Sequence, residues 1–229
     1  MNEREVWVTG CGAVSAAGIG APPLEQALLG ERSCVSVERV EGPPLGRAPD
    51  PPPSREGRRL DRSARMFLTS ATEAWGRAGL DQEPPRDASR VAIVEGSSLG
   101  PMSELIDAAR QLGHGWRRRA RPTDIIRFMT GAGGAAFAQS RGIGGPVLHV
   151  SGGSISGACA IGEAAQWIAC GRVDVAVAGG AESPIHAEIV GLFGAAGILA
   201  HANSGTRQGQ RGQRLPGECR PFDVHRCGT

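Results

Sequence analysis

The sequence contains neither lysine nor tyrosine, and all 25 of its basic residues are arginine. The missing pair excludes redox enzymes of the short-chain dehydrogenase class, which need a catalytic tyrosine and lysine. The formal net charge of +2 across 229 residues is small, so the charge balance does not point to a nucleic-acid partner. No apolar run approaches the roughly 18–20 residues that cross a bilayer, and we therefore expect no membrane span.

The cysteines and histidines form no recognisable ligand pattern. The six cysteines are irregularly spaced without a CxxC pair, and a chain of this length does not need disulfides to fold. We interpret them as reduced thiols of a cytoplasmic protein, which fits the lack of an apolar signal segment before the first predicted strand. The five histidines lack metal-ligand spacing, so we predict neither a metal nor another bound cofactor.

The apolar residues predict an alternation of strands and helices. Strands are expected at 5–9, 91–94, 147–150 and 173–178, and helices at 23–29, 61–79, 103–112 and 155–170, with 124–140 partly helical. Such alternation is typical of a parallel or mixed sheet with helices on both faces, and thus of an α/β fold. A chain of 229 residues can form this fold as a single domain.

Two segments interrupt this pattern. Residues 40–57 contain six prolines, which predicts an irregular surface loop with polyproline character. Residues 200–216 are polar and rich in glycine, and we expect a mobile loop there.

The segment TGCGAVS at 9–15 imitates a dinucleotide-binding loop, but the imitation is incomplete. Ser15 occupies the place of the third glycine, and no predicted strand leads to the acidic Glu31. A tight turn between a strand and a helix is the better interpretation.

The most informative segment is LHVSGGSISG at 148–157. A buried strand there meets two glycines and passes into an Ala-rich helix, which predicts a strand–turn–helix elbow with Ser154 at its apex. Such an elbow exposes a nucleophile to the free N–H groups of a helix N-terminus, and this geometry suits acyl transfer. The alternative is that Ser154 is simply a helix N-cap.

A serine hydroxyl needs a neighbouring base to act as a nucleophile. His149 precedes the elbow on the same predicted strand, but the sequence leaves open which face its side chain takes. Cys159 lies five residues beyond Ser154, and we expect it on the packing side of the helix. The sequence supports no Ser–His–Asp arrangement.

Several segments, taken in order, resemble the N-terminal half of the β-ketoacyl-[acyl carrier protein] synthases of the thiolase superfamily. They are VWVTGCGAVS at 6–15, GIGGP at 142–146, the elbow, IGEAA at 161–165, DVAVAGGAE at 174–182, GAA at 194–196 and RPFD at 220–223. The resemblance implies a thiolase-like, layered α/β/α/β/α fold, of which residues 1–229 supply the N-terminal half. It also implies acyl transfer from an acyl carrier protein or coenzyme A thioester, followed by decarboxylative condensation, in fatty acid or polyketide biosynthesis.

The same resemblance suggests roles for individual residues. Ser154 occupies the position of the family's cysteine nucleophile, and its N–H would be one oxyanion donor. Ile155 and Phe193 are expected to contact the substrate, although core packing is the alternative for Phe193. Glu182 is expected to support the elbow structurally. The thioester is the substrate, and the resemblance implies no cofactor.

Family members act with an acyl carrier protein and form homodimers or pair with a related synthase subunit. The carrier is acidic, so the basic run at 117–121 is a candidate for recruiting it. The alternative is that this run is a solvated loop.

Two departures from the family limit the expected activity. Serine in place of cysteine predicts weak or absent condensation, because a hydroxyl is harder to activate than a thiol. The sequence also stops shortly after RPFD, before the family's two catalytic histidines, its lysine and its Gly-rich oxyanion loop, so we expect a truncated domain. Three hypotheses remain: an impaired acyltransferase, a non-catalytic partner resembling a chain-length factor, and a degenerate fragment.

Overall fold

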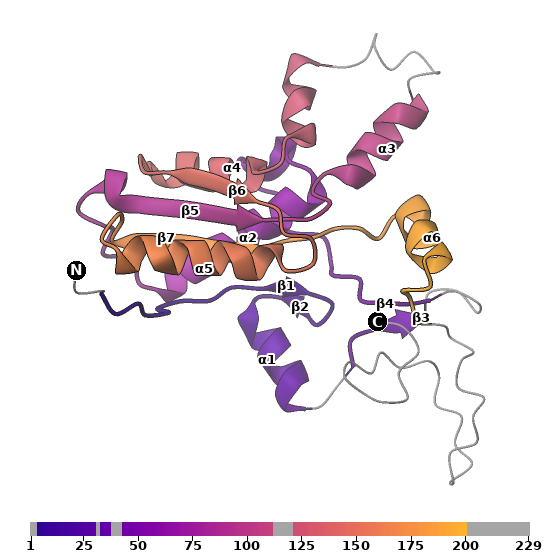
Figure 1. Ribbon diagram of the computed structural model, residues 1–229, viewed down its shortest axis with the longest axis horizontal. Helices are drawn as coiled ribbons and strands as arrows, with labels where there is room; N and C mark the ends of the chain where they lie inside the picture. Colours follow the sequence, from indigo (N-terminus) through magenta and orange to yellow (C-terminus); the bar gives the residue numbers. More distant parts are fainter. Residues whose placement is uncertain (1–3, 31–32, 38–42, 112–120, 201–229) are drawn as a thin grey trace.

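The computed structural model describes residues 4–30, 33–37, 43–111 and 121–200. At its centre is a three-stranded sheet in the order β6–β5–β7, with all three strands parallel (Figure 1). The strands are β5 (Val91–Gly96), β6 (Val147–Val150) and β7 (Val175–Gly180), and the helices that cover them are α2 (Arg62–Arg77), α4 (Ala132–Arg141) and α5 (Ser156–Ala169). The predicted α/β fold is confirmed.

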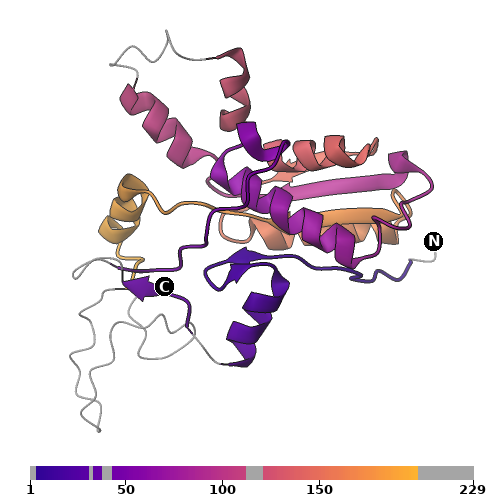
Figure 2. The same cartoon turned by 180° about the vertical axis from the view of Figure 1, so that it is seen from behind.

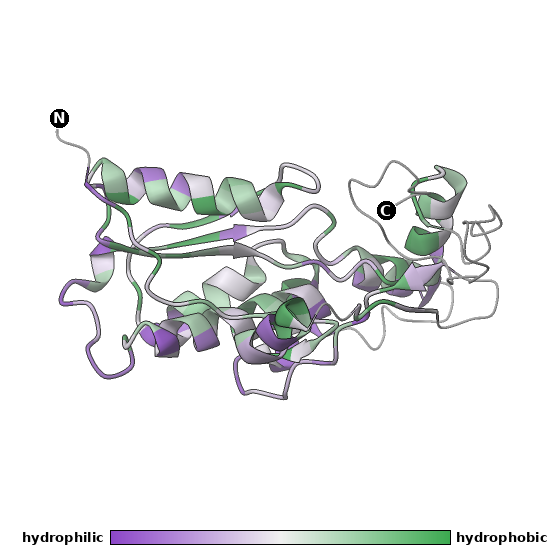
Figure 3. Ribbon diagram, turned by 90° about the horizontal axis from the view of Figure 1, so that it is seen from below, coloured by the Kyte–Doolittle hydropathy of each residue, from purple (hydrophilic) through white to green (hydrophobic). Residues whose placement is uncertain are grey.

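The central strand β5 is buried along its whole length, and its residues alternate between two hydrophobic clusters. Val91 and Ile93 pack with α2 and α4, whereas Ala92 and Val94 pack against α5. This alternation follows from the two-residue period of a strand. Viewed from below the orientation of Figure 1, helices lie on both sides of the strands (Figure 3). The sheet is therefore the middle layer, and its apolar residues on both faces hold the helices in place.

Helix α2 begins and ends where its sequence predicts. Asp61 is the N-cap, and its carboxylate accepts a hydrogen bond from the N–H of Ala64 at 3.1 Å. Trp75 in the last turns packs edge-on against Phe137 of α4, with ring centroids 5.7 Å apart. Gly79, with φ of +77°, follows the C-terminal end in a conformation that favours glycine.

Smaller elements surround these layers. They are β1 (Val14–Ser15), β2 (Gly18–Ile19), α1 (Ala21–Leu29), β3 (Ser36–Val37), β4 (Pro44–Leu45), η1 (Gly57–Arg59), η2 (Ala88–Arg90), α3 (Met102–Gln111), η5 (Pro122–Phe128) and α6 (Ala187–Ala195). Front and back views agree that α3 and α6 project beyond the carboxyl ends of the strands (Figures 1 and 2). In the part of the chain that the structure describes, no helix is long and apolar enough to span a membrane.

The predicted strand at 5–9 is wrong. The segment belongs to no strand, and Trp7 and Val8 keep 76% and 88% of their surface exposed. Alternating apolar residues indicate an extended chain, but a strand also needs a partner with which to exchange backbone hydrogen bonds. No residue within the described ranges pairs with this segment.

The glycines of the TGCGAVS segment serve packing. A Cβ atom on Gly10 would lie 2.2 Å from the carbonyl oxygen of Ala74, and one on Gly12 would lie 2.1 Å from that of Ser70. Only glycine permits such close contact between this segment and the backbone of α2. The chain then enters the short antiparallel hairpin of β1 and β2. The prediction of a tight turn between a strand and a helix is therefore wrong, because no strand precedes this segment in the described chain and a hairpin follows it.

The described part of the proline-rich segment, residues 43–57, contains β4 and, at Gly57, the start of η1. Pro44 and Leu45 form β4, which pairs with β3 in an isolated two-stranded ladder. Proline is tolerated there because an edge strand does not need every N–H donor. The loop predicted at 200–216, the basic run at 117–121 and the RPFD segment lie largely or wholly outside the described residues.

One acidic residue is buried in the sheet. Glu95 on β5 is 4% exposed, and its carboxylate accepts a hydrogen bond from the N–H of Gly134 at 2.6 Å. Burial raises the pKa of Glu95 to about 7, the negative charge of Asp61 adds to the rise, and the Gly134 hydrogen bond opposes it. Glu95 therefore carries a proton in the folded protein under conditions in which the unfolded chain has released it.

This proton predicts a stability that depends on pH. The free energy of unfolding should fall as pH rises from 4.5 to about 7, because the folded state then binds the extra proton more tightly than the unfolded state. In Glu95→Gln, the fall in the free energy of unfolding between pH 4.5 and pH 8 should be smaller than in the wild type by about 3 kcal/mol. Urea denaturation at several pH values measures it. Glu163→Gln on α5 is the control, and an unchanged pH slope in Glu95→Gln would contradict the assignment.

Candidate active site at the strand–helix elbow

The predicted elbow is present between β6 and α5. The strand ends at Val150, the helix begins at Ser156, and Gly153 in the turn between them has φ of +65°. This left-handed conformation favours glycine and explains its presence there. Ser154 follows immediately and is exposed at the apex.

Ser156, rather than Ser154, fastens the elbow. Its hydroxyl accepts a hydrogen bond from the N–H of Gly152 at 3.0 Å and donates one to the carbonyl oxygen of Gly153 at 2.6 Å. Ser156 is 3% exposed, whereas the N-cap of α5 is Ile155, which makes no side-chain capping bond. The alternative of Ser154 as N-cap is therefore wrong. The hydroxyl of Ser154 has no hydrogen-bond partner among the described residues, which leaves it available to a ligand.

Three glycines allow the first turn of α5 to touch the ends of two strands. A Cβ on Gly96 of β5 would lie 2.3 Å from the carbonyl oxygen of Ser156. A Cβ on Gly180 of β7 would lie 2.8 Å from the Cα of Gly157. These contacts fix where the N-terminus of α5, with its unpaired N–H groups, meets the carboxyl edge of the sheet.

A cavity of about 520 Å³ opens at this edge. Its volume is typical of a small-molecule site, and the carboxyl ends of parallel strands are where open α/β sheets bind ligands. Ser154 lies in its wall together with Phe193 of α6 and Leu99, which follows β5. Ile155 is 63% exposed and is not among the lining residues, so of the two residues expected to contact substrate only Phe193 faces this cavity.

Comparison with known proteins identifies the family. Residues 50–228 match the model of the β-ketoacyl synthase N-terminal domain. The chain belongs to the β-ketoacyl synthase family. A putative polyketide β-ketoacyl synthase 1 of Streptomyces halstedii is 32% identical over 242 residues, covering 98% of this chain and 55% of the relative. The polyketide biosynthesis malonyl-ACP decarboxylase PksF of Bacillus subtilis is 29% identical over 250 residues, covering 99% of this chain and 55% of the relative.

The fold agrees with this family. The crystal structure of a β-ketoacyl synthase from Burkholderia phymatum superposes with a TM-score of 0.78 at 23% identity, covering all of this chain and 56% of that one. The thiolase-like fold and the resemblance to the N-terminal half are therefore confirmed. The chain spans about half the length of the curated relatives that it matches.

In this β-ketoacyl synthase domain, Glu182 holds the rim of the elbow cavity. Its carboxylate accepts hydrogen bonds from the Ser97 hydroxyl at 3.0 Å, from the Leu99 N–H at 3.3 Å and from the Ser98 N–H. These donors come from the loop after β5, which is thereby tied to the end of β7. The carboxylate is occupied by backbone and hydroxyl donors, in agreement with the structural role expected for it.

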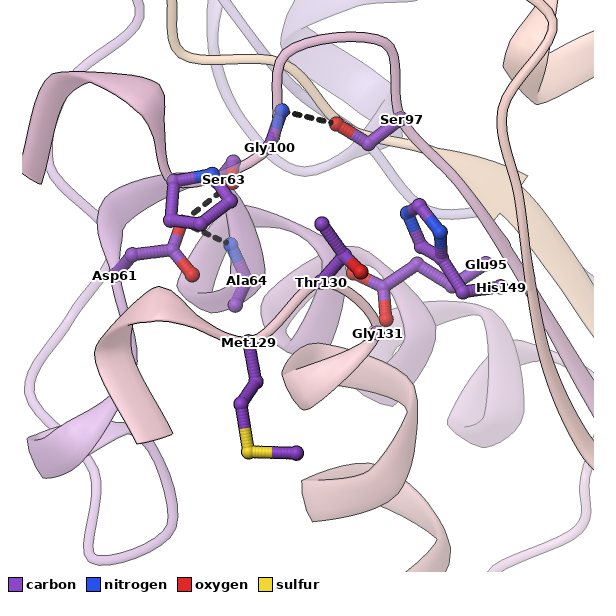
Figure 4. A pocket seen from close by; sticks show the side chains of 11 residues that line it. Asp61, Ser63, Ala64, Glu95, Ser97, Gly100, Met129, Thr130, Gly131 and His149 are labelled. Carbon is purple, nitrogen blue, oxygen red and sulfur yellow. Dashed lines mark hydrogen bonds between the residues drawn. The ribbon is translucent and has the colours of Figure 1, made fainter. Parts of the chain in front are cut away.

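His149 is not placed to activate Ser154. Its side chain enters a second, smaller cavity beside Glu95 and Thr130 (Figure 4), whereas Ser154 lines the elbow cavity. Burial lowers the pKa of His149, and the negative charge of Glu182 opposes the shift. Among the described lining residues of the elbow cavity, Glu182 is the one ionisable side chain. Because the Glu182 carboxylate already accepts hydrogen bonds from the loop after β5, the described part of the domain supplies no free base for Ser154.

Cys159 was expected on the packing side of α5, and this expectation is wrong. It is exposed, because the helix buries the stripe formed by Ala160, Ala164 and Trp167 against the sheet. Its sulfur lies close to Gly152 in the elbow, at 3.1 Å from the position a Cβ would take there. Cys159 is nevertheless absent from the wall of the elbow cavity.

Two adjacent glycines at the end of β7 offer a matched test of the elbow contacts. Gly180→Ala places a methyl group against Gly157 and should destabilise the domain by about 1–3 kcal/mol. Gly179→Ala meets no atom within 4 Å and should change stability by less than about 0.5 kcal/mol. Chemical denaturation of both variants measures the difference, and equal stabilities would show that the close approach is unimportant.

Proposed function

We propose that this protein is an acyltransferase of the β-ketoacyl-[acyl carrier protein] synthase type, acting in fatty acid or polyketide biosynthesis. The observation that carries the proposal is the exposed Ser154 hydroxyl at the apex of the elbow, in a cavity of about 520 Å³ at the N-terminus of α5. Family membership supports the substrate class, an acyl thioester.

In the acyl transfer step, the Ser154 oxygen attacks the thioester carbonyl. The bond from the acyl carbon to the carrier's sulfur breaks, and an ester to Ser154 forms. The Ser154 N–H and the positive end of the α5 dipole stabilise the negative charge on the carbonyl oxygen. The serine proton must pass to a base that the described residues do not supply. For this reason we propose that condensation is impaired relative to a cysteine enzyme.

We further propose that an acyl carrier protein delivers the acyl group and that the protein pairs with a second copy or a related synthase subunit in the cytoplasm. The printed name of the Bacillus relative, a malonyl-ACP decarboxylase, supports the carrier. The described Cys11, Cys159 and Cys170 are outside any disulfide, which supports a reducing compartment. We propose that no cofactor takes part in the chemistry.

Ser154 also favours a second candidate function, decarboxylation of a malonyl thioester without condensation. In that reaction the carbon–carbon bond to the carboxylate breaks, carbon dioxide leaves, and a proton from solvent completes an acetyl thioester. No acyl acceptor is needed, so a serine at the elbow is no disadvantage. The named decarboxylase activity of the Bacillus relative supports this candidate.

Mass spectrometry of the intact native protein tests the first proposal. After incubation with acyl-loaded carrier protein, we expect an acyl group on Ser154 that is absent from Ser154→Ala. In Ser154→Cys, acylation should be faster by about tenfold or more, because a thiolate is the better nucleophile. Equal labelling of wild type and Ser154→Ala would place the acceptor elsewhere and contradict the proposal.

Following carbon dioxide release from malonyl-loaded carrier protein separates the remaining hypotheses. Release that survives in Ser154→Ala indicates the decarboxylase. If the protein neither acquires an acyl group nor releases carbon dioxide, yet co-purifies with a complete synthase, the non-catalytic partner resembling a chain-length factor is correct. If the protein shows no acylation, no carbon dioxide release and no co-purification with a synthase, the degenerate fragment is the remaining hypothesis.

A further inference from the structure

A second cavity, of about 10 Å³, lies on the face of the sheet that α2 and α4 cover, among groups that the proposed acyl chemistry does not use (Figure 4). It is bounded by β5 and β6 on one side and by the N-termini of α2 and α4 on the other. Polar side chains from these elements surround it: Asp61, Ser63, Glu95, Ser97, Thr130 and His149. A space of this size accommodates about one water molecule, provided that the water finds two to four polar partners.

Glu95 and His149 contribute the partners on the sheet side. They are direct neighbours in the parallel register of β5 and β6, and Figure 4 shows the carboxyl group and the imidazole side by side. The described hydrogen bond of Glu95 is made by Oε2 with Gly134, and Oε1 has no described donor. Nε2 of His149 is buried and has no hydrogen-bond partner among the described residues. Glu95 is 4% exposed, and buried polar groups of this kind are usually hydrogen-bonded.

Asp61 contributes the partner on the opposite side. It is 2% exposed, and both of its described hydrogen bonds, from the Ser63 hydroxyl and the Ala64 N–H, are accepted by Oδ1. Oδ2 is left without a donor among the described residues. Figure 4 shows Asp61 across the cavity from Glu95 and His149. Polar side chains from three elements therefore line one water-sized space, and His149 Nε2 among them is buried without a described partner.

We propose that this cavity is a binding site for a single water molecule, which accepts a hydrogen bond from protonated Glu95 and donates to His149 Nε2 and to Asp61. The protonation states agree with their surroundings. Burial raises the pKa of Glu95 to about 7, so Glu95 is mostly protonated near pH 6, and burial lowers the pKa of His149, which favours its neutral form. From α4, the uncharged Gly133 and Gly134 face Glu95. Three hydrogen bonds is the usual number for a buried water.

The bound water would join the elements that carry the elbow. His149 stands on β6, which runs directly into the turn before Ser154. Glu95 stands on β5, which runs into Ser97, and Ser97 donates its hydroxyl to Glu182 at the rim of the elbow cavity. The water thus connects both strands to the start of α2. The water site does not depend on acylation of Ser154, so its test and the test of the proposed function have separate outcomes.

A high-resolution crystal structure at pH 6 tests the site directly. We expect one peak of electron density in the cavity, within hydrogen-bond distance of Glu95 Oε1, His149 Nε2 and Asp61 Oδ2. Glu95→Gln keeps an N–H donor and should keep the peak, whereas Glu95→Leu should lose it. Glu163→Gln on α5 is the matched control and should leave the peak unchanged. Absence of density in the wild-type cavity, or a peak that contacts neither Glu95 nor His149, would overturn the proposal.

A measurement in solution covers the case in which Glu95→Leu fails to fold. In the wild-type protein, a long-lived water should give nuclear Overhauser contacts to the ring protons of His149 and the methyl group of Thr130. These contacts should weaken above pH 8, because ionised Glu95 no longer donates to the water. If no such contacts are seen at pH 6, the water exchanges too fast to be tightly bound, and the proposal is refuted.

Discussion

The structure depends on the contact between the first turn of α5 and the glycine ends of β5 and β7. A side chain at Gly96 or Gly180 would collide with the helix backbone, so the helix can approach the sheet only at these positions. From this contact follow the direction of the α5 N-terminus, the position of the turn that carries Ser154, and the elbow cavity between α5 and α6. Hydrophobic burial of Ala160, Ala164 and Trp167 then holds the rest of the helix on the sheet.

Polar groups near the carboxyl edge of the sheet line two separate cavities. Ser154 and Glu182 line the elbow cavity, and Glu95 and His149 line the small cavity. Ser97 connects them, because it lines the small cavity and donates its hydroxyl to Glu182. The elbow cavity is large enough for a substrate, whereas the small cavity is suited to one solvent molecule.

Local sequence patterns predicted most of the elements, because each pattern reflected an interaction that the element itself makes. The elbow was visible in the Gly-Gly pair between a β-branched run and an Ala-rich segment, and α2 was visible in its apolar periodicity. The segment 5–9 was not, since a strand depends on a partner that its own residues do not specify. The direction of the Cys159 side chain was also missed, because it depends on which stripe of α5 the sheet selects. The pairing of Glu95 with His149 depends on the register of two strands that lie far apart in the sequence, and no local pattern encodes it. The stapling role of Ser156 was within reach of the sequence, since a serine two residues beyond the apex is placed to bond back to the turn.

The division of work between Ser154 and Ser156 has a consequence for how such a site can change over evolutionary time. Ser156 carries the hydrogen bonds that keep the turn in shape, while Ser154 is exposed and unencumbered by any described partner. The residue at the apex can therefore be exchanged without changing the turn that carries it. One nucleotide change there can exchange a thiol for a hydroxyl while the backbone, the helix and the cavity stay as they are. Reactivity and foldability are encoded by different residues two positions apart, so a lineage can alter or abandon its chemistry without first losing its fold.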